Sequence, residues 1–199
     1  MRRSILSPER DYVFSDFFHL AYPTEDIVKE FGIDYSLAPL ELPRKEIAEK
    51  PVRRFQEELT MKLPKISLNS EVARRDFLIA PILLELLNFI DGRISAEYPL
   101  EVERNLRGTL DYLVRTDKQL MVIEAKKADL DKGFTQLAVE LIAVARYEED
   151  AGPLFGVVTT GDLWKFGKLE GRRVTKDMDV YRVPKDMVDL FGVLVGVLT

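Results

Sequence analysis

The chain has 199 residues, of which 46% are hydrophobic and 32% are charged, and its formal net charge is −5. This length and composition are typical of one compact domain with its own core, and they exclude a disordered chain. The slight acidity provides no overall positive field of the kind that marks many nucleic-acid-binding proteins, so any contact with a polyanion must be local.

The most apolar stretch, residues 187–198, is twelve residues long. A helix that crosses a bilayer needs roughly 20 apolar residues, so this stretch predicts no membrane span. The first residues carry charge, but no long apolar run follows them as it does in a secretory signal. We therefore expect a cytoplasmic protein.

The chain contains no cysteine and a single histidine, His19. The absence of thiols excludes disulfides, thiolate nucleophiles and iron–sulfur clusters. One imidazole does not make a histidine-rich zinc site, and we expect His19 to be an ordinary surface or half-buried side chain. Hydrolytic chemistry in this chain must therefore depend on carboxylates, lysine and a hard metal ion.

Residues 1–60 are rich in aromatic side chains, are interrupted by Pro8 and Pro23, and become strongly charged after residue 41. This pattern predicts an N-terminal extension of helical and irregular structure, followed by the main domain over residues 61–199. Asn69 and Ser70 are typical helix-capping residues, and the acid Glu71 follows them, so a helix is expected to start here. Apolar side chains then recur every three or four residues, which predicts a helix over residues 71–90 with a kink at Pro81.

Three runs of β-forming residues with short connections follow, and they predict a meander with strands over residues 93–103, 108–115 and 119–126. A helix is expected over residues 129–149, a buried strand over residues 154–160 and a closing amphipathic segment over residues 185–198.

Residues 120–123 are apolar on both faces, which favours a central strand covered by helices on both sides. The order of strand, long helix and strand over residues 119–160 predicts a right-handed parallel crossover. Gly192 and Gly196 would permit either close helix contact within the core or a dimer seam. The elements together indicate an α/β fold with a mixed central sheet flanked by helices.

The residues with potential chemistry lie where the apolar strand ends. Side chains alternate along a strand, so Glu124 and Lys126 share one face and Lys127 projects to the other. Ligands tend to bind at this end of a strand in open α/β sheets. If the preceding strand pairs antiparallel, Asp111 lies near Glu124, and a divalent cation between the two carboxylates would relieve their repulsion. A structural ion pair between Glu124 and Lys126 is the alternative.

A strip of positive charge in the last third of the sequence consists of Lys165, Lys168, Arg172, Arg173 and Lys176. This strip predicts either a surface that contacts phosphates or an ordinary exposed hairpin. Trp164, which precedes the strip, is expected to be a packing residue.

Several short motifs occur in a recognisable order: Gly-Thr-Leu-Asp-Tyr at 108–112, Val-Ile-Glu-Ala-Lys at 122–126, and Gln136 with Glu140 on the following helix. Together with the helix that begins at Ser70 and Glu71, they resemble the PD-(D/E)XK nuclease superfamily over roughly residues 70 to 170. Within it, the chain is most similar to small restriction-endonuclease-like proteins related to the nuclease domain of type I restriction R subunits. Leu110 stands where the family name has proline. The resemblance implies a restriction-endonuclease-like αβββαβ core.

The resemblance implies a metal site at Asp111 and Glu124, with the backbone carbonyl of Ala125 as a third ligand. Mg²⁺ or Mn²⁺ is the implied cofactor, because Mg²⁺ prefers oxygen ligands and retains several waters.

The resemblance also implies roles for three further residues. Lys126 would orient or help to deprotonate the attacking water and offset charge on the phosphate. Glu71 would support the water or a second cation, and Gln136 would hold the lysine or the nucleophile by hydrogen bonds. Considered alone, Gln136 and Glu140 are only a polar pair spaced by four residues on a helix.

The resulting prediction is a Mg²⁺-dependent endonuclease that hydrolyses DNA phosphodiester bonds. The alternative is a catalytically inactive module of the same fold that binds DNA or a partner protein. Cleavage of both strands favours two active sites, so a homodimer is expected. The sequence has no Gly-x-x-x-x-Gly-Lys-Ser/Thr loop, so any ATP-driven motor, like any specificity subunit, must be a separate polypeptide.

Overall fold

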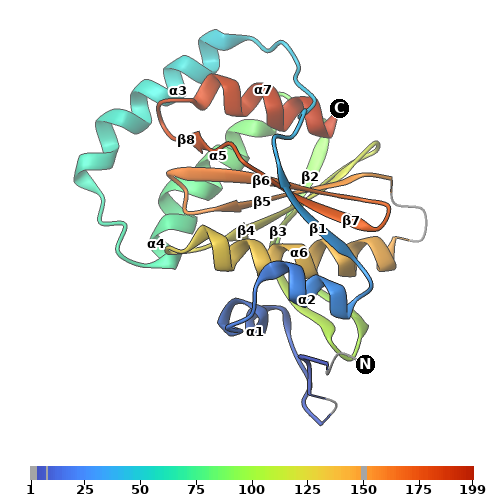
Figure 1. The fold of residues 1–199 in the computed structure, drawn as a ribbon. Helices are drawn as coiled ribbons and strands as arrows, with labels where there is room; N and C mark the ends of the chain where they lie inside the picture. Colours follow the sequence, from blue (N-terminus) through green and yellow to red (C-terminus); the bar gives the residue numbers. More distant parts are fainter. Residues whose placement is uncertain (1–3, 8, 149–151) are drawn as a thin grey trace.

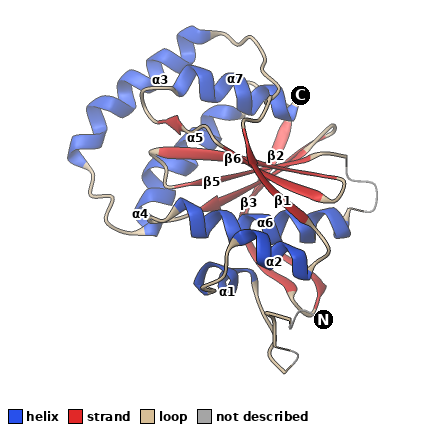
Figure 2. Cartoon of the chain, viewed as in Figure 1, coloured by secondary structure: helices blue, strands red, loops and turns tan. Residues whose placement is uncertain are grey.

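The computed structural model describes residues 4–7, 9–148 and 152–199 and shows one mixed β-sheet with helices against both faces (Figures 1 and 2). Two of the elements are helices of other types: η1 (Leu63–Lys65) is a 3₁₀-helix and η2 (Arg75–Ile79) is a π-helix. The elements in chain order are α1 (Phe14–His19), α2 (Thr24–Glu30), β1 (Asp34–Ala38), α3 (Glu49–Lys62), η1 (Leu63–Lys65), α4 (Glu71–Arg74), η2 (Arg75–Ile79), α5 (Ala80–Leu86), β2 (Gly92–Glu103), β3 (Leu106–Thr116), β4 (Leu120–Ala125), α6 (Leu130–Tyr147), β5 (Leu154–Thr159), β6 (Leu163–Glu170), β7 (Arg173–Asp177), β8 (Tyr181–Arg182) and α7 (Met187–Leu198).

The sheet has the strand order β1-β7-β6-β5-β4-β3-β2, with β8 paired to β6. The predicted meander is confirmed, because β2, β3 and β4 are consecutive and antiparallel. The predicted crossover is parallel: β4 pairs with β5 through Met121↔Phe155, and α6 connects the two strands. Every residue of β4 is buried, as expected for a strand that is apolar on both faces. The mixed sheet and its helices confirm the α/β class.

Helices lie on either side of this sheet (Figure 1), and the buried hydrophobic residues form two clusters. One core contains buried residues of α3, α5 and α7, such as Phe191, which packs edge-to-face against Phe55. The other contains buried residues of α1, α2 and α6, such as Phe17 and Phe134. Trp164 is fully buried and its indole N–H donates to the carbonyl of Gly161 at 2.8 Å, so it is a packing residue, as predicted. Among the helices of the described ranges, none has the length and apolarity of a bilayer-spanning segment.

The predicted helix over residues 71–90, with a kink at Pro81, differs from the structure in two respects. The helical segment ends at Leu86, and it contains the π-helical turn η2 between α4 and α5. Pro81 lies in the first turn of α5, directly after η2. A proline removes one backbone donor and crowds the preceding turn of an α-helix, and a change in hydrogen-bond pattern just before it accommodates both effects. Ser70 caps the start as predicted, because its hydroxyl accepts from Ala73 N at 3.0 Å.

The N-terminal residues contribute a strand that the sequence interpretation omitted. β1 pairs parallel with β7 at the edge of the sheet, with Asp34 opposite Arg173. This strand has only five residues and no strict alternation of burial, so it produces little sequence signal. The predicted boundary at residue 60 falls within α3, which continues to Lys62.

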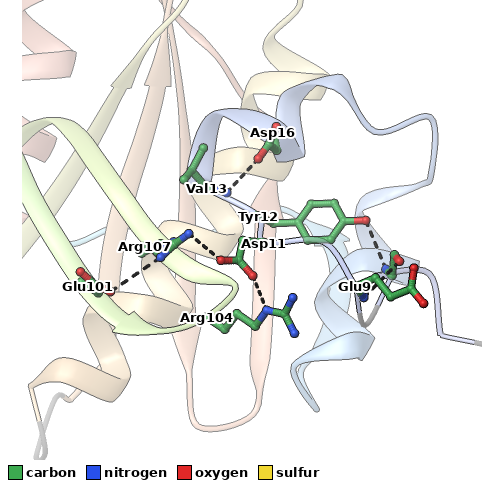
Figure 3. Close-up of polar contacts among 9 residues, drawn as sticks. Glu9, Asp11, Tyr12, Val13, Asp16, Glu101, Arg104 and Arg107 are labelled. Atoms are coloured by element: carbon green, nitrogen blue, oxygen red, sulfur yellow. Dashed lines mark hydrogen bonds and ion pairs between the residues drawn. The ribbon is translucent and has the colours of Figure 1, made fainter.

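Residues before α1 are attached to the hairpin between β2 and β3 by ion pairs (Figure 3). Asp11 contacts Arg104 and lies 2.9 Å from Arg107, whose guanidinium also lies 3.9 Å from Glu101. Phe14 packs so closely on Gly108 that a Cβ there would lie 2.8 Å from the phenyl ring. These contacts fix α1 beside β3, close to the carboxyl end of β4.

The two glycines of α7 allow close contact within this chain. The backbone N–H of Lys45 donates to the carbonyl of Gly192 at 3.0 Å. A Cβ built on Gly196 would lie 2.5 Å from the carbonyl oxygen of Pro43. The segment that precedes α3 therefore crosses α7 at its two glycines. Of the two alternatives expected for these glycines, close contact within the core and a dimer seam, the structure shows the first.

We expect Gly196→Ala to lower the free energy of unfolding by about 1–3 kcal/mol. Alanine favours a helix more than glycine does, but here its methyl group would meet backbone atoms, which yield less readily than a side chain. Urea denaturation would measure the change. Gly152→Ala is the matched control, because a Cβ at residue 152 meets no atom within 4 Å. Equal stability of the Gly196→Ala variant and the wild-type chain would show that the α7 crossing tolerates a side chain.

Candidate active site

The carboxyl end of β4 brings Asp111, Glu124 and Lys126 together. The ladder between β3 and β4 ends at Tyr112↔Ile123, so Asp111 and Glu124 are the next positions in this register. Asp111 Oδ2 accepts a hydrogen bond from the backbone N–H of Ala125 at 2.8 Å. The ammonium group of Lys126 donates to Oε1 of Glu124. Alternation along the strand therefore places the acid and the lysine of the predicted motif in direct contact.

Burial dominates the electrostatics of Glu124, whose side chain is 1% exposed. Burial raises its pKa well above the ordinary range, and the nearby carboxyl groups of Glu140 and Asp111 raise it further. The ion pair with Lys126 opposes these effects but does not cancel them. Glu124 is thus a carboxyl group that holds a proton more tightly than an exposed glutamate does.

Lys126 is 11% exposed and remains a cation. Burial acts to lower the pKa of its ammonium group, but attraction to Glu124, and then to Glu71 and Asp111, raises that pKa above its ordinary value. A lysine with a raised pKa is protonated at neutral pH, so it can donate hydrogen bonds and offset negative charge but does not act as a general base.

Glu140 on α6 completes a buried carboxyl pair with Glu124. Its side chain is 0% exposed, and Oε1 accepts a hydrogen bond from the amide of Gln136 at 2.9 Å. Burial raises the pKa of Glu140 to about 7, against the opposing hydrogen bond from Gln136 and the attraction of Lys126. Like charges repel strongly in a low-dielectric site, so these two neighbouring carboxyl groups titrate together and hold a proton more tightly than exposed acids do.

Arg75 of η2 holds the other side of Asp111. Its guanidinium lies 3.5 Å from Asp111 Oδ1 and 3.3 Å from Glu97, and it sits over the ring of Tyr112 with 5.4 Å between the guanidinium carbon and the ring centroid. The π-helical turn before Pro81 thus bears an arginine that meets a predicted site residue. π-bulges are frequent at functional sites.

The two other predicted residues lie nearby but in different roles. Glu71 begins α4, is half-buried and affects the pKa of Lys126 through space. The side-chain amide of Gln136 donates to Glu140, and its oxygen accepts no hydrogen bond from Lys126, so of the two partners that the resemblance implies, the lysine and the nucleophile, the lysine is not contacted. Its amide oxygen is buried and has no hydrogen-bond partner.

The sequence interpretation did not assign site roles to Glu140, Arg75 or Phe18. Glu140 carried a usable signal, since it falls on the inward, apolar side of a predicted helix. Phe18 carried none: its ring lies 5.3 Å from the ammonium nitrogen of Lys126 and comes from a segment 108 residues earlier in the chain. Gly133 of α6 packs on the lysine stem, because a Cβ there would lie 2.9 Å from Lys126 Cγ.

The predicted basic strip on β6 and β7 is largely paired. Lys176 is buried and bonds to Asp131, and Lys168 lies 3.0 Å from Glu170. Arg172 donates to the carbonyl of Gly32 at 3.0 Å. These contacts make the strip a structural part of the hairpin and leave Lys165 as the member considered further below.

The oxygen donors of the site are compatible with a hard divalent cation. Oε2 of Glu124, Oε2 of Glu140 and Oε1 of Gln136 are buried without a hydrogen-bond partner. Unsatisfied buried oxygens are costly, and a cation that prefers oxygen ligands would satisfy them. Within the described ranges, no group of three or more histidine, cysteine, aspartate or glutamate residues is arranged to hold a metal. Asp111 and Glu124 are two carboxylates at one strand end, and a cation held by so few protein ligands would have to keep several waters, as Mg²⁺ usually does.

The arrangement offers buried acids for a cation and a fixed ammonium group for an anion at one strand end. Comparisons of the chain with protein-family profiles, with curated proteins and with solved structures found no match.

Proposed function

We propose that the chain is a Mg²⁺- or Mn²⁺-dependent endonuclease that hydrolyses DNA phosphodiester bonds. The observation that supports it is the meeting of Asp111, Glu124 and Lys126 at the carboxyl end of β4. The proposal is also supported by the order of α4 to α5, β2, β3, β4, α6 and β5, which agrees with the αβββαβ order expected of a restriction-endonuclease-like core. A homodimer and a separate motor or specificity subunit are part of the same proposal.

Asp111 and Glu124, with the carbonyl of Ala125, would hold the cation, which when bound supplies Lewis-acid stabilisation and a more acidic water. Lys126 keeps its proton because Glu124 and the neighbouring acids raise its pKa. Its ammonium group therefore orients the attacking water and donates to a phosphate oxygen as charge develops there. Phe18 and Gly133 fix the position of that ammonium group. Glu140 lies near Glu124 and raises the pKa of its carboxyl group by charge repulsion.

Calorimetric titration with Mn²⁺, paired with a cleavage assay on plasmid DNA, tests the proposal. We expect saturable binding by the wild-type chain and a more than tenfold loss of affinity in Asp111→Asn. Asparagine preserves the acceptor for Ala125 N, while it removes the charge and replaces the oxygen that faces Arg75 by an amide nitrogen. Asp189→Asn is the control, because Asp189 is exposed on α7.

The second candidate function is a module that binds DNA or a partner protein without catalysis. The pairing of both Asp111 oxygens, one with Ala125 N and one with Arg75, favours it, because these contacts must be displaced or shared when a cation binds. The absence of saturable Mn²⁺ binding, together with no cleavage of single-stranded or double-stranded DNA, would select this function over the first.

A further inference from the structure

A cavity of about 540 Å³ adjoins the candidate active site at the carboxyl ends of β4 and β5. It lies against the first residues of α6, and Lys127, Thr160 and Val180 are among the residues that line it. This volume lies within the range of small-molecule sites, and the end of parallel strands is where open α/β sheets bind ligands. Among the described residues that line this cavity, none belongs to the proposed catalytic centre, so the proposed reaction does not explain the cavity.

The acids around the cavity are already paired. Asp162 lies 2.7 Å from Arg74, and Asp131 bonds to Lys176. Asp129 caps α6 by accepting from the backbone N–H of Lys132 at 3.1 Å. These carboxylates therefore contribute little uncompensated negative charge to a ligand.

Two cations of the lining have no carboxylate partner among the described residues. Lys127 is exposed and forms no ion pair there. The ammonium group of Lys165 donates only to the backbone carbonyls of Asp177 and Met178, at 3.2 and 3.4 Å. The effective charge of the lining is thus positive, which favours an anion such as a phosphate.

The remaining lining suits a flat, partly apolar group. Leu130, Leu163 and Val180 supply apolar surface. Thr160 is 6% exposed, and its hydroxyl oxygen has no hydrogen-bond partner, nor does Nε of Arg74. A nucleobase combines an apolar face with hydrogen-bond donors and acceptors along its edge. It therefore matches a lining that has both apolar side chains and unpartnered polar atoms.

We propose that this cavity holds the nucleotide adjacent to the scissile bond, with its phosphate on Lys127 and Lys165 and its base against Leu130, Leu163 and Val180. The inference rests on the proposed function, which makes DNA the ligand. β4 ends at Ala125, and of the next two residues Lys126 contacts Glu124 whereas Lys127 lines the cavity. Their Cα atoms are about 3.8 Å apart, so a DNA strand that presents one phosphodiester to Lys126 can place the neighbouring nucleotide at this cavity.

The test is a titration of the full chain with thymidine 5′-monophosphate, without divalent cation, followed by ¹H–¹⁵N NMR. We expect saturable shifts at Leu130, Thr160 and Leu163, and about tenfold weaker binding by Lys127→Glu. Lys50→Glu is the control, since Lys50 is an exposed lysine on α3. Thr160→Val removes an unpartnered hydroxyl, so this variant should stay folded and bind the nucleotide more weakly.

Saturable shifts confined to other surfaces, no saturable binding, or equal affinity of Lys127→Glu and the wild-type chain would each overturn the inference. Cleavage of plasmid DNA with Mn²⁺ is scored separately. Nucleotide binding in the cavity without cleavage supports the site and rejects the endonuclease. Cleavage by a chain that does not bind the nucleotide here rejects the site and leaves the endonuclease standing.

Discussion

Replacement of Lys126 by alanine is expected to lower the rate of DNA cleavage by about 10²- to 10⁴-fold. The ammonium group is fixed by Glu124 and by the ring of Phe18, and its raised pKa keeps it charged. Its removal takes away the cation that offsets developing charge on the phosphate. Single-turnover cleavage of plasmid DNA with Mg²⁺ would measure the effect.

Two controls separate this effect from damage to the fold. Lys50→Ala removes the same charge from α3 and should cleave at the wild-type rate. Lys126→Met keeps the aliphatic stem that packs on Gly133, and it should be as slow as Lys126→Ala. Cleavage by Lys126→Ala at the wild-type rate, with Mg²⁺ bound, would contradict the proposed role.

Glutamine at position 140 is expected to increase the free energy of unfolding at pH 8 by about 3 kcal/mol. The folded chain raises the pKa of Glu140 from 4.5 to about 7, so ionisation of this buried group at higher pH is costly. An amide has no charge to bury. Its amide oxygen can accept from Gln136, so the hydrogen bond at position 140 is preserved.

Glu140 binds a proton more tightly in the folded chain than in the unfolded chain. Between pH 4.5 and about 7 the folded chain retains a proton on Glu140 that the unfolded chain releases. The free energy of unfolding of the wild-type chain therefore falls as the pH rises across this interval. Glu140→Gln should reduce this fall by the part due to Glu140, while the part due to Glu124, whose pKa is also raised, remains. Urea denaturation at pH 5 and pH 8 would measure it. Glu57→Gln, on the exposed side of α3, should behave as the wild type does. An unchanged pH dependence in Glu140→Gln would assign the effect to another group.

The central part of the fold was predictable because its elements have strong periodicity. The meander of β2, β3 and β4, the long helix α6 and the strand β5 all combine regular apolar spacing with short connections. β1 and η2 were not predicted. The five residues of β1 are defined by their pairing with β7, which is a contact between distant parts of the chain. The π-helical turn depends on how the backbone adapts to Pro81 within a packed core.

The site was predictable to the extent that it lies on one strand. Alternation alone placed Glu124 beside Lys126, and antiparallel pairing brought Asp111 to the same end. The pairing of Glu140 with Gln136 was visible as a spacing of four, but its burial beneath Glu124 was not. Phe18 and Arg75 reach the site through tertiary packing, for which a single sequence provides no local pattern.

The parallel pair of β1 and β7 also constrains the order of folding. Asp34 and Arg173 are neighbours in the sheet but are 139 positions apart in the sequence, since 173 minus 34 is 139. During synthesis, the earliest strand must wait for one of the last before its backbone groups are satisfied. Contacts this distant slow folding, and an unpaired strand is open to association with other chains. We therefore expect the backbone groups of β1 that bond to β7 to stay unpaired until the carboxyl-terminal third of the chain has been synthesised.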